Sequence, residues 1–396
     1  MKVFKDAFAT LASLRLTVVL FSLAMVLILA GTLAQVNEGV WTVVDRYFRS
    51  VFVIIPLQLF VPEKVARIPG VVPFPGGLTL GVLIFINLLA AHFTRFKMNW
   101  KRSGIIISHL GVLLLLVGEF VTGAMADEGN MTIDEGASSN FVEDTRTTEL
   151  AIIDRAPGGD DLVVVVPQRL LAHGAHSGQP VTHGLLPFEV KVEEWMPNSR
   201  ILGPMQATES QRKKADAGAG AQMAAVPAPM ATGVNGSEVD APSAYVTFSK
   251  GGQKLGTYLV SLYFDQAQPV TVDGKQYDVE LRFKRTYKPY TVHLIDFKHD
   301  KFVGTNKPRN FSSLVRLMDP SRGTDREVLI YMNTPLRYSG DTLYQAAFKQ
   351  GDTGTILQVV SNPGWLIPYI SCVMVTVGLL IHFGVRLSGS IRRKTA

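Results

Sequence analysis

Residues 101–122 read KRSGIIISHLGVLLLLVGEFVT, in which two cations precede a long and almost wholly apolar run. An apolar helix of about 20 residues, rising about 1.5 Å per residue, crosses the roughly 30 Å hydrocarbon core of a bilayer. The sequence predicts such a helix at Ile105–Thr122. Three further runs predict helices at Leu16–Leu33, from near Leu78 to near Phe93, and at Leu366–Phe383.

Composition agrees with a membrane protein. Hydrophobic residues make up 47% of the 396 residues and charged residues 18%, against about 25% charged in soluble domains. The single cysteine, Cys372, excludes a disulfide, a CxxC pair, a cysteine zinc site and a CxxCH haem attachment within this chain. The net charge of +6 comes largely from cations at the ends of the apolar runs. The lipid bilayer therefore explains the basic character, and we expect no nucleic-acid partner.

These cations also predict the orientation. They form three clusters, which fall on one side of the membrane if all four runs span, and cytoplasmic loops are enriched in Lys and Arg. The predicted location is the inner (cytoplasmic) membrane, with the largest segment on the extracytoplasmic side. The first helix is expected to be a retained signal anchor, because its apolar core is too long for a cleaved signal peptide. The clusters are Lys2, Lys5 and Arg15, then Arg95, Lys97, Lys101 and Arg102, and finally Arg386, Arg392, Arg393 and Lys394.

Five segments follow from this topology. They are a cytoplasmic N-terminus with the first helix (1–36), an extracytoplasmic loop (37–77), the second and third helices with a basic cytoplasmic loop (78–123), an extracytoplasmic β-rich domain (124–364), and the last helix with a basic cytoplasmic tail (365–396). The first outer loop contains VFVIIPLQLF at 51–60, where Pro56 and the following Pro62 disfavour a spanning helix. Either an interfacial segment or a loop packed under the outer domain accounts for it.

Strand signals dominate the large outer segment. The runs LVVVV at 162–166 and YLVSLYF at 258–264 are β-branched and aromatic. Asp273-Gly274 stands between alternating segments and predicts a hairpin with a type I′ turn. We expect an all-β, antiparallel, sandwich-like domain without amphipathic helices. A low-complexity insertion near 207–239 is expected to be weakly ordered.

The eight histidines fall into different settings. His173, His176 and His183 lie in a Gly-rich stretch, which we interpret as an exposed loop rather than a metal site. His293 and His299 lie in the strand-rich region and are expected to be ordinary surface or packing residues.

His92, His109 and His382 differ because they lie in apolar helices, where ionisable groups are costly and usually face a bundle interior or a cofactor. Their distances from the flanking cations predict similar depths in the cytoplasmic half of the bilayer.

A haem is one explanation for these three histidines. Neutral imidazoles ligate haem iron axially, and apolar helix surfaces bury the ring. Phe93, Phe96 and Phe383 are candidates to pack on the ring, and the loop cations are candidates to pair with its propionates. Two alternatives remain open, namely histidines that reach back to water and a proton relay. Spacing alone does not choose between them.

Three segments resemble the ResB (CcsB) family of cytochrome c biogenesis proteins. The first is SLRLTVVLFSLAMVLILAGTLAQ at 13–35, and the second is KRSGIIISHLGVLLLLVGEF at 101–120. The third is VLIYMNTPLRYSGDTLYQAAF at 328–348, followed by NPGWLIPYISCVMVTVGLLIHF at 362–383. The order of elements, three helices, a large outer domain and a last helix, is also similar. The stretch 200–245 matches nothing in that family.

This resemblance implies a role in system II cytochrome c maturation. The family works with CcsA, a tryptophan-rich haem-handling membrane protein, and the pair moves non-covalent haem b outward. The haem is then attached to apocytochrome c, whose cysteines a thiol-reducing thioredoxin-like protein keeps reduced. The resemblance makes His109 an axial ligand of the haem iron and leaves the second ligand to the partner. His92 and His382 are further candidates that lack a matched family role.

One departure limits the expected activity. The four tryptophans, Trp41, Trp100, Trp195 and Trp365, are scattered, so the tryptophan-rich segment of CcsA is absent from this chain. The expected role is a non-catalytic or accessory subunit of a haem lyase complex. Two alternatives stand beside it. One is a cofactor-free, membrane-anchored β-domain scaffold. The other is a haem electron carrier, which needs a second buried histidine pair that the predicted spans do not contain.

Overall fold

The computed structural model describes residues 10–61, 65–95, 99, 102–155, 160–212, 214–231, 239–302, 304 and 308–395. It divides into two compact units. The helical unit comprises Met1–Asp127, Thr232–Ser237 and Ser361–Ala396, and the β-rich unit comprises Glu128–Ala231 and Glu238–Val360.

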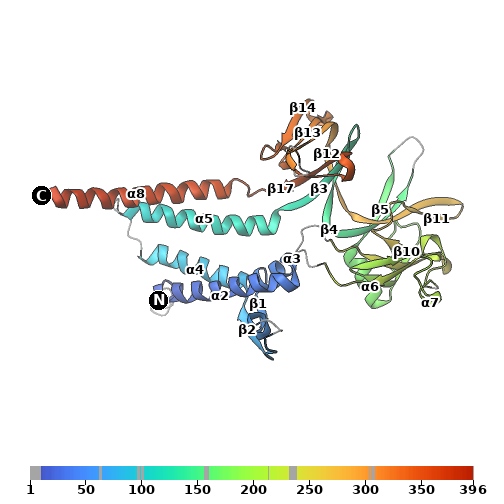
Figure 1. Ribbon diagram of the computed structural model, residues 1–396, viewed down its shortest axis with the longest axis horizontal. Coiled ribbons are helices and arrows are strands. Elements are labelled where there is room, and N and C mark those ends of the chain that lie inside the picture. Colours follow the sequence, from blue (N-terminus) through green and yellow to red (C-terminus); the bar gives the residue numbers. More distant parts are fainter. Residues whose placement is uncertain are drawn as a thin grey trace. The chain divides into compact units, whose positions relative to one another are not determined.

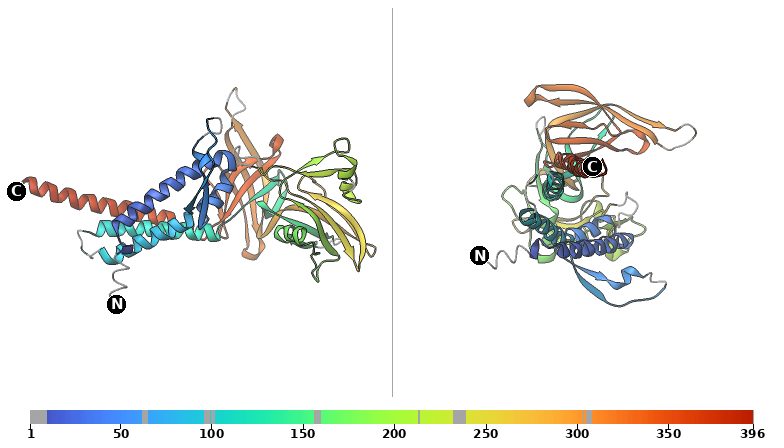
Figure 2. Two further views of the ribbon diagram at one scale, coloured as in Figure 1. Left: turned by 90° about the horizontal axis from the view of Figure 1, so that it is seen from below. Right: turned by 90° about the vertical axis from the view of Figure 1, so that its left-hand side faces the viewer.

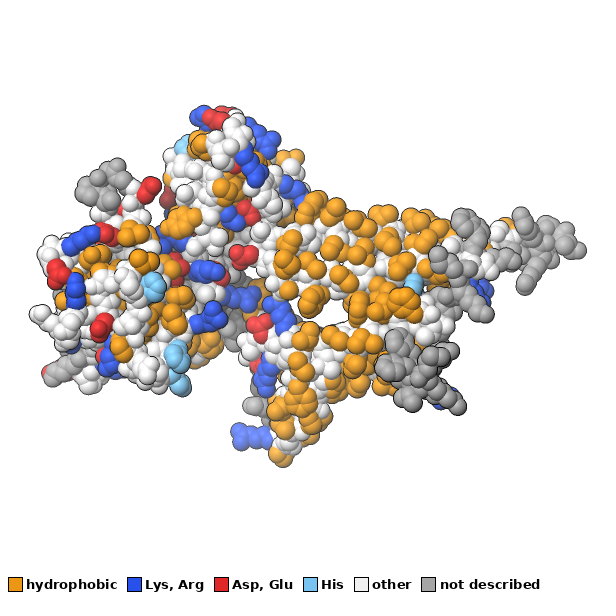
Figure 3. Space-filling view, turned by 180° about the vertical axis from the view of Figure 1, so that it is seen from behind, with side chains coloured by type: hydrophobic (Ala, Val, Ile, Leu, Met, Phe, Trp, Pro, Cys, Tyr) orange, Lys and Arg blue, Asp and Glu red, His pale blue; other side chains and the backbone are white. Residues whose placement is uncertain are grey.

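Four helices of the described chain are long and apolar enough to cross a membrane. They are α2 (Leu14–Glu38), α4 (Gly77–Arg95), α5 (Ser103–Met125) and α8 (Ile367–Thr395). The prediction of four apolar helices is therefore confirmed, although α2 and α8 continue beyond their predicted ends at Leu33 and Phe383. Figure 3 shows hydrophobic side chains covering the helices, whereas acidic side chains gather on the β-rich part.

The segment between α2 and α4 folds into short elements and a β-hairpin. After α3 (Val40–Val43) and a π-helical turn η1 (Val44–Phe48), strand β1 (Phe52–Pro56) pairs antiparallel with β2 (Val71–Pro75). A 3₁₀ turn η2 (Leu57–Phe60) follows β1. The buried side chains of this segment share one hydrophobic core with α2 and α4. The members of this core are Leu20, Leu27, Ala30, Ala34, Val43, Tyr47, Val53, Ile55 and Leu80.

The β-rich unit is built around one ten-stranded antiparallel sheet. Its main path runs β14-β13-β12-β4-β3-β17-β16-β15, and β5 and β11 pair with β4 and β12. The two ends of the path approach each other, since β14 lies beside β15 and β16. The antiparallel prediction is confirmed, but the sheet curls toward a barrel, which the expected sandwich did not include. The bounds are β3 (Asp127–Asp134), β4 (Ser138–Asp154), β5 (Leu162–Pro167), β11 (Gln268–Val272), β12 (Lys275–Lys301), β13 (Pro308–Asp319), β14 (Thr324–Tyr331), β15 (Leu336–Tyr338), β16 (Asp341–Phe348) and β17 (Gly354–Ser361).

This unit has two large hydrophobic cores, and a smaller cluster lies around Met196, Tyr245 and Leu259. The first lies where the three-stranded sheet of β6 (Glu189–Met196), β9 (Ser243–Lys250) and β10 (Gln253–Ser261) joins the large sheet, and it includes Leu150, Val246, Val260 and Leu281. The second lies within the curled part and includes Met131, Val292, Leu317 and Leu357. Strands β4 and β12 contribute side chains to both cores. Figure 2 shows these long strands running through the β-rich part.

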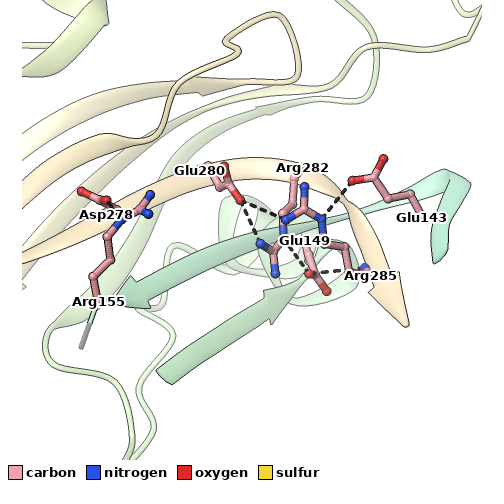
Figure 4. A network of polar contacts seen from close by, with 7 residues as sticks. All are labelled: Glu143, Glu149, Arg155, Asp278, Glu280, Arg282 and Arg285. Carbon is pink, nitrogen blue, oxygen red and sulfur yellow. Dashed lines mark hydrogen bonds and ion pairs between the residues drawn. The ribbon is translucent and has the colours of Figure 1, made fainter. Parts of the chain in front are cut away.

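Buried charges occupy the stretch of β4 and β12 between the two cores. Arg282 donates to Glu149 at 3.1 Å and to Glu280 at 2.8 Å, and its side chain is only 8% exposed. Arg285 donates to Glu143 at 2.9 Å. A register shift in the pairing with β4 falls at this point, between Phe283 and Arg285. Figure 4 shows this network, in which each buried cation has a carboxylate partner, as burial of charge requires.

Several local predictions can be compared with the structure. Asp273 and Gly274 have positive φ values of 51° and 78° and join β11 to β12 as a two-residue turn, which confirms the type I′ hairpin. The insertion is more ordered than expected, because β8 (Ala224–Pro227) pairs with β7 (Ser199–Leu202) and buries Ala224 and Ala225. Short helices α7 (Glu209–Arg212) and η4 (Gly218–Ala221) precede β8. Residues 232–238 of the insertion lie outside the described residues.

The expectation that the β-rich segment lacks amphipathic helices is wrong. Helix α6 (Gln168–Ser177) begins after Pro167 and ends at Gly178, which takes the left-handed conformation at φ 68°. It buries Leu171 and Gly174 against the first core. His173 and His176 therefore lie on a helix, and not in the Gly-rich loop that the composition indicated.

Candidate functional site

Helices α5 and α8 pack with their backbones in contact. A Cβ atom placed on Gly104 would lie 2.5 Å from the backbone nitrogen of His382, and one on Gly111 would lie 3.0 Å from the carbonyl oxygen of Ser371. Gly118 instead meets the side chain of Ile367, since a Cβ atom there would lie 2.6 Å from its Cγ2 atom. Small residues allow this close approach in membrane helices. The seven-residue spacing of these three glycines is the sequence signal that could have identified this helix pair.

The contact fixes which way α5 is turned. Ser108 donates to the carbonyl of Gly104 at 3.0 Å and to that of Val375 on α8 at 3.5 Å, so Ser108 faces α8. His109 follows one residue later, about 100° around the helix. Its side chain is therefore directed away from the centre of the α5–α8 contact.

His109 lies on α5 and His92 on α4, and these two helices contact each other. The two imidazoles lie close enough to affect each other electrostatically, and both residues are half-buried. The Nδ1 atom of each ring is shielded from solvent. The structure therefore brings together two of the three predicted histidines, from two different helices.

His382 lies elsewhere along the helices. It is level with Gly104, five residues before His109, which corresponds to about 7.5 Å along the helix axis. Its ring contacts Phe383 edge-on, with centroids 5.5 Å apart. Phe93 on α4 and Phe383 on α8 are exposed by 75% and 64%. Phe96, Lys97 and Lys101, expected around a cofactor, lie outside the described residues, as does the side chain of Arg95.

The residues around His109 and His92 suit a flat apolar group with an iron centre. Such a group needs one or two imidazoles and otherwise apolar walls. Within the described part of the chain, no group of three or more His, Cys, Asp or Glu side chains gathers to hold a bare metal ion. Imidazoles on apolar helices are donors that a haem can use.

Two of the other histidines, His293 and His299, have structural partners in the β-rich unit. His293 hydrogen-bonds to Ser138 at 3.0 Å. His299 pairs through Nδ1 with Asp352 at 2.8 Å and stacks on Phe311 and Phe348, with its side chain only 6% exposed. These contacts give both residues ordinary packing roles in the β-rich unit.

The asparagine-proline-glycine turn before α8 is fixed against the end of α5. The Asn362 side chain accepts from the backbone nitrogen of Gly364 at 2.8 Å and donates to Thr122 at 3.2 Å. This turn aligns the start of α8 with the end of α5 and so fixes the pairing of the two helices.

Comparison with known proteins agrees with these motifs. The ResB-like family matches residues 255–356, from β10 to the start of β17. Over these residues the chain is ResB-like. The resemblance to the ResB family is thereby confirmed, and the ResB-like region contains the 328–348 motif, whereas the helix motifs lie outside it.

Two individual proteins are similar to this chain. Protein NrfI of Wolinella succinogenes is 29% identical over 115 residues, which are 29% of this chain and 13% of NrfI. A solved structure of the cytochrome c heme lyase CcmF aligns with 91% of this chain and 34% of its own, at 11% identity and a TM-score of 0.21. A score this low carries no inference about the fold. The residues matched in NrfI are only a small part of that much longer protein.

Proposed function

We propose that this chain is a membrane subunit of a system II cytochrome c synthase, which binds haem b between its helices and helps to present it to apocytochrome c. The observation that carries the proposal is the placement of two half-buried histidines, His109 and His92, on the contacting helices α5 and α4. The ResB-like match supports the choice of pathway. In this proposal the basic helix ends face the cytoplasm, and the β-rich unit lies outside it.

In this function the chain would bind and position its cargo. His109 would hold the haem iron through its imidazole, and His92 is the candidate within this chain for a second ligand or for a neighbouring proton acceptor. Haem supplies vinyl groups that form thioethers with the cysteine thiolates of apocytochrome c. The β-rich unit and a CcsA-type partner would hold these reactants at high effective concentration. No catalytic side chain of this chain is assigned.

Haem binding can be tested with the full chain in lipid nanodiscs. We expect wild-type protein supplied with haem to give a Soret band. His109→Ala is expected to lose it, and free imidazole is expected to restore it by occupying the vacated ligand position. His92→Ala is expected to weaken or shift the band.

His382→Ala is the matched control, because it removes a histidine from an apolar helix at a different level. Its band is expected to remain. A Soret band that survives both His109→Ala and His92→Ala unchanged would overturn the proposed site. Colourless wild-type protein would instead favour the cofactor-free scaffold.

A further inference from the structure

The hairpin β1–β2 is attached rigidly to the ends of two membrane helices. Gly76 donates to the carbonyl of Val51 at 3.0 Å, and Leu78 donates to that of Ser50 at 3.2 Å. A Cβ on Gly76 would lie 2.1 Å from the Ser50 carbonyl oxygen. Only glycine permits this approach, so the base of the hairpin is held where α4 begins. Figure 1 shows the hairpin projecting to one side of α2, near the end where α3 follows.

The register decides which backbone groups point outward. Leu57 donates to Gly70 at 3.0 Å, continuing the ladder in which Val53 faces Phe74 and Ile55 faces Val72. Hydrogen-bonded pairs alternate with pairs whose N–H groups point away from the hairpin. The outward set is therefore Phe52, Ile54, Pro56, Val71, Pro73 and Pro75.

Prolines remove half of the donors that this set would expose. Pro56, Pro73 and Pro75 have no N–H group. The outward carbonyl of Ile54 accepts from Arg46 at 3.5 Å. The two open edges of the hairpin are thus poor templates for an added strand. Bringing these edges near lipid also costs less free energy, because lipid cannot accept a hydrogen bond from a free backbone N–H group.

The same residues form one apolar face. Side chains of paired residues lie on the same side of a sheet, so Phe52, Ile54 and Val71 share a face with the three prolines. They are exposed by 56%, 48% and 60%. The opposite face is buried along β1, where Val53 and Ile55 pack into the core of the helical unit, whereas Val72 of β2 is 40% exposed. The exposed face carries no polar side chain.

Exposed cations and a tryptophan lie close to the hairpin in the sequence. Arg49 and Arg67 are both exposed, and Trp41 is 55% exposed on α3. Tryptophan and basic residues next to an apolar surface are typical of the membrane–water interface. A protein partner generally requires hydrogen bonds across its interface, about one per 100–200 Å², and this face offers no side chain for them.

We propose that the β1–β2 hairpin is an interfacial membrane anchor. Its apolar face inserts into the headgroup–acyl boundary of the leaflet at the Glu38 end of α2. The anchor lies beside the helices and fixes their depth and rotation in the membrane. This proposal does not depend on haem binding.

Depth-dependent quenching tests the proposal on the full chain. In a Cys372→Ser background, Phe52→Cys is labelled with an environment-sensitive nitrobenzoxadiazole fluorophore and reconstituted alone into liposomes. Phosphatidylcholines with a doxyl group high or low on the acyl chain then act as quenchers. Leu185→Cys, at a side chain 66% exposed in the β-rich unit, is the matched control.

We expect the label at position 52 to be quenched, more strongly by the shallow doxyl group than by the deep one, and the label at 185 to be unaffected. No quenching at 52 would overturn the anchor. If the signal at 52 changes only when a partner membrane protein is added, the face is a protein-docking surface and the proposal is wrong. Ile54→Cys repeats the measurement on the same face, so a folding defect in one variant does not leave the question open.

Discussion

Gly104 and His382 touch through their backbones, because a Cβ atom on Gly104 would stand 2.5 Å from the His382 nitrogen. Backbone atoms cannot rotate away as a side chain can. The close approach of α5 and α8 therefore depends on the missing side chain at 104. The position of His382 along the helix pair depends on it as well.

Substitution at this contact should separate the two helices. We expect Gly104→Ala to lower the stability of the helical unit by about 1–3 kcal/mol, as overpacking does. Thermal unfolding in detergent, followed by far-UV circular dichroism, measures the loss. Gly123→Ala on the same helix is the control, because a Cβ there meets nothing within 4 Å. An equal loss in both variants would contradict the packing explanation.

The buried Arg282 should be essential to the β-rich unit. Arg282→Met leaves Glu149, with a side chain only 6% exposed, without its main counter-charge. We expect a loss of about 3–5 kcal/mol in urea unfolding, the usual cost of breaking a buried pair. The double variant Arg282→Met/Glu149→Leu should recover much of it.

Arg316→Met provides the matched control for this pair. Arg316 and Asp325 form an ion pair whose side chains are 50% and 53% exposed. Its loss should cost far less than the loss of Arg282, because solvent screens an exposed pair. Equal costs for Arg282→Met and Arg316→Met would show that burial is not the deciding factor.

Asp319 should make stability depend on acid pH. Hydrogen bonds from the hydroxyl groups of Ser321 and Tyr338, at 2.6 and 2.8 Å, hold the pKa of its carboxyl below the usual range. A pKa lowered by folding stabilises the protein above the unfolded value, near 3.9. This stabilisation is lost as the pH falls through the lower folded value.

Asp319→Asn should therefore be less stable than wild type at pH 7, and the difference should shrink as the pH falls below about 4. Urea unfolding across pH measures it. Tyr338→Phe removes one donor and should bring the Asp319 pKa back toward its ordinary value. If the difference in stability between wild type and Asp319→Asn stays constant with pH, the Asp319 carboxylate is not the cause of the pH dependence.

Tyr47 should tolerate loss of its hydroxyl group. Its ring is buried, and its oxygen makes no hydrogen bond with any residue that the structure describes. Tyr47→Phe should leave thermal stability unchanged or raise it by about 1 kcal/mol. Tyr245→Phe is the contrasting variant. The backbone nitrogen of Ala225 donates to the Tyr245 hydroxyl at 3.0 Å, and this substitution removes the acceptor. That variant should lose about 1–3 kcal/mol.

Hydrophobic length predicted the membrane helices well because it is a local property of the chain. The predicted span Ile105–Thr122 lies within the observed α5. The hairpin β1–β2 was not predicted, because VFVII at 51–55 is apolar at every position and lacks the alternation that identifies a strand. Helix α6 was missed because Gly174 and Gly178 imitate a loop, although one is a close-packing position and the other a helix cap.

The candidate site was predictable only in part. Spacing from the flanking cations placed the three histidines in similar parts of their helices. Which histidines meet depends on how each helix is rotated about its axis, and this rotation is set by contacts such as that of Ser108 with Val375. Residues far apart in sequence determine that rotation, so composition and local spacing cannot supply it.

The two cores of the β-rich unit cannot be separated by cutting the chain. Strand β4 places Val142 in one core and Leu150 in the other, and β12 does the same with Val292 and Leu281. Any truncation point between them would sever a strand that both halves need. A protein engineer seeking a water-soluble fragment should therefore express Glu128–Val360 as a whole. The same shared strands predict that it melts in a single cooperative step.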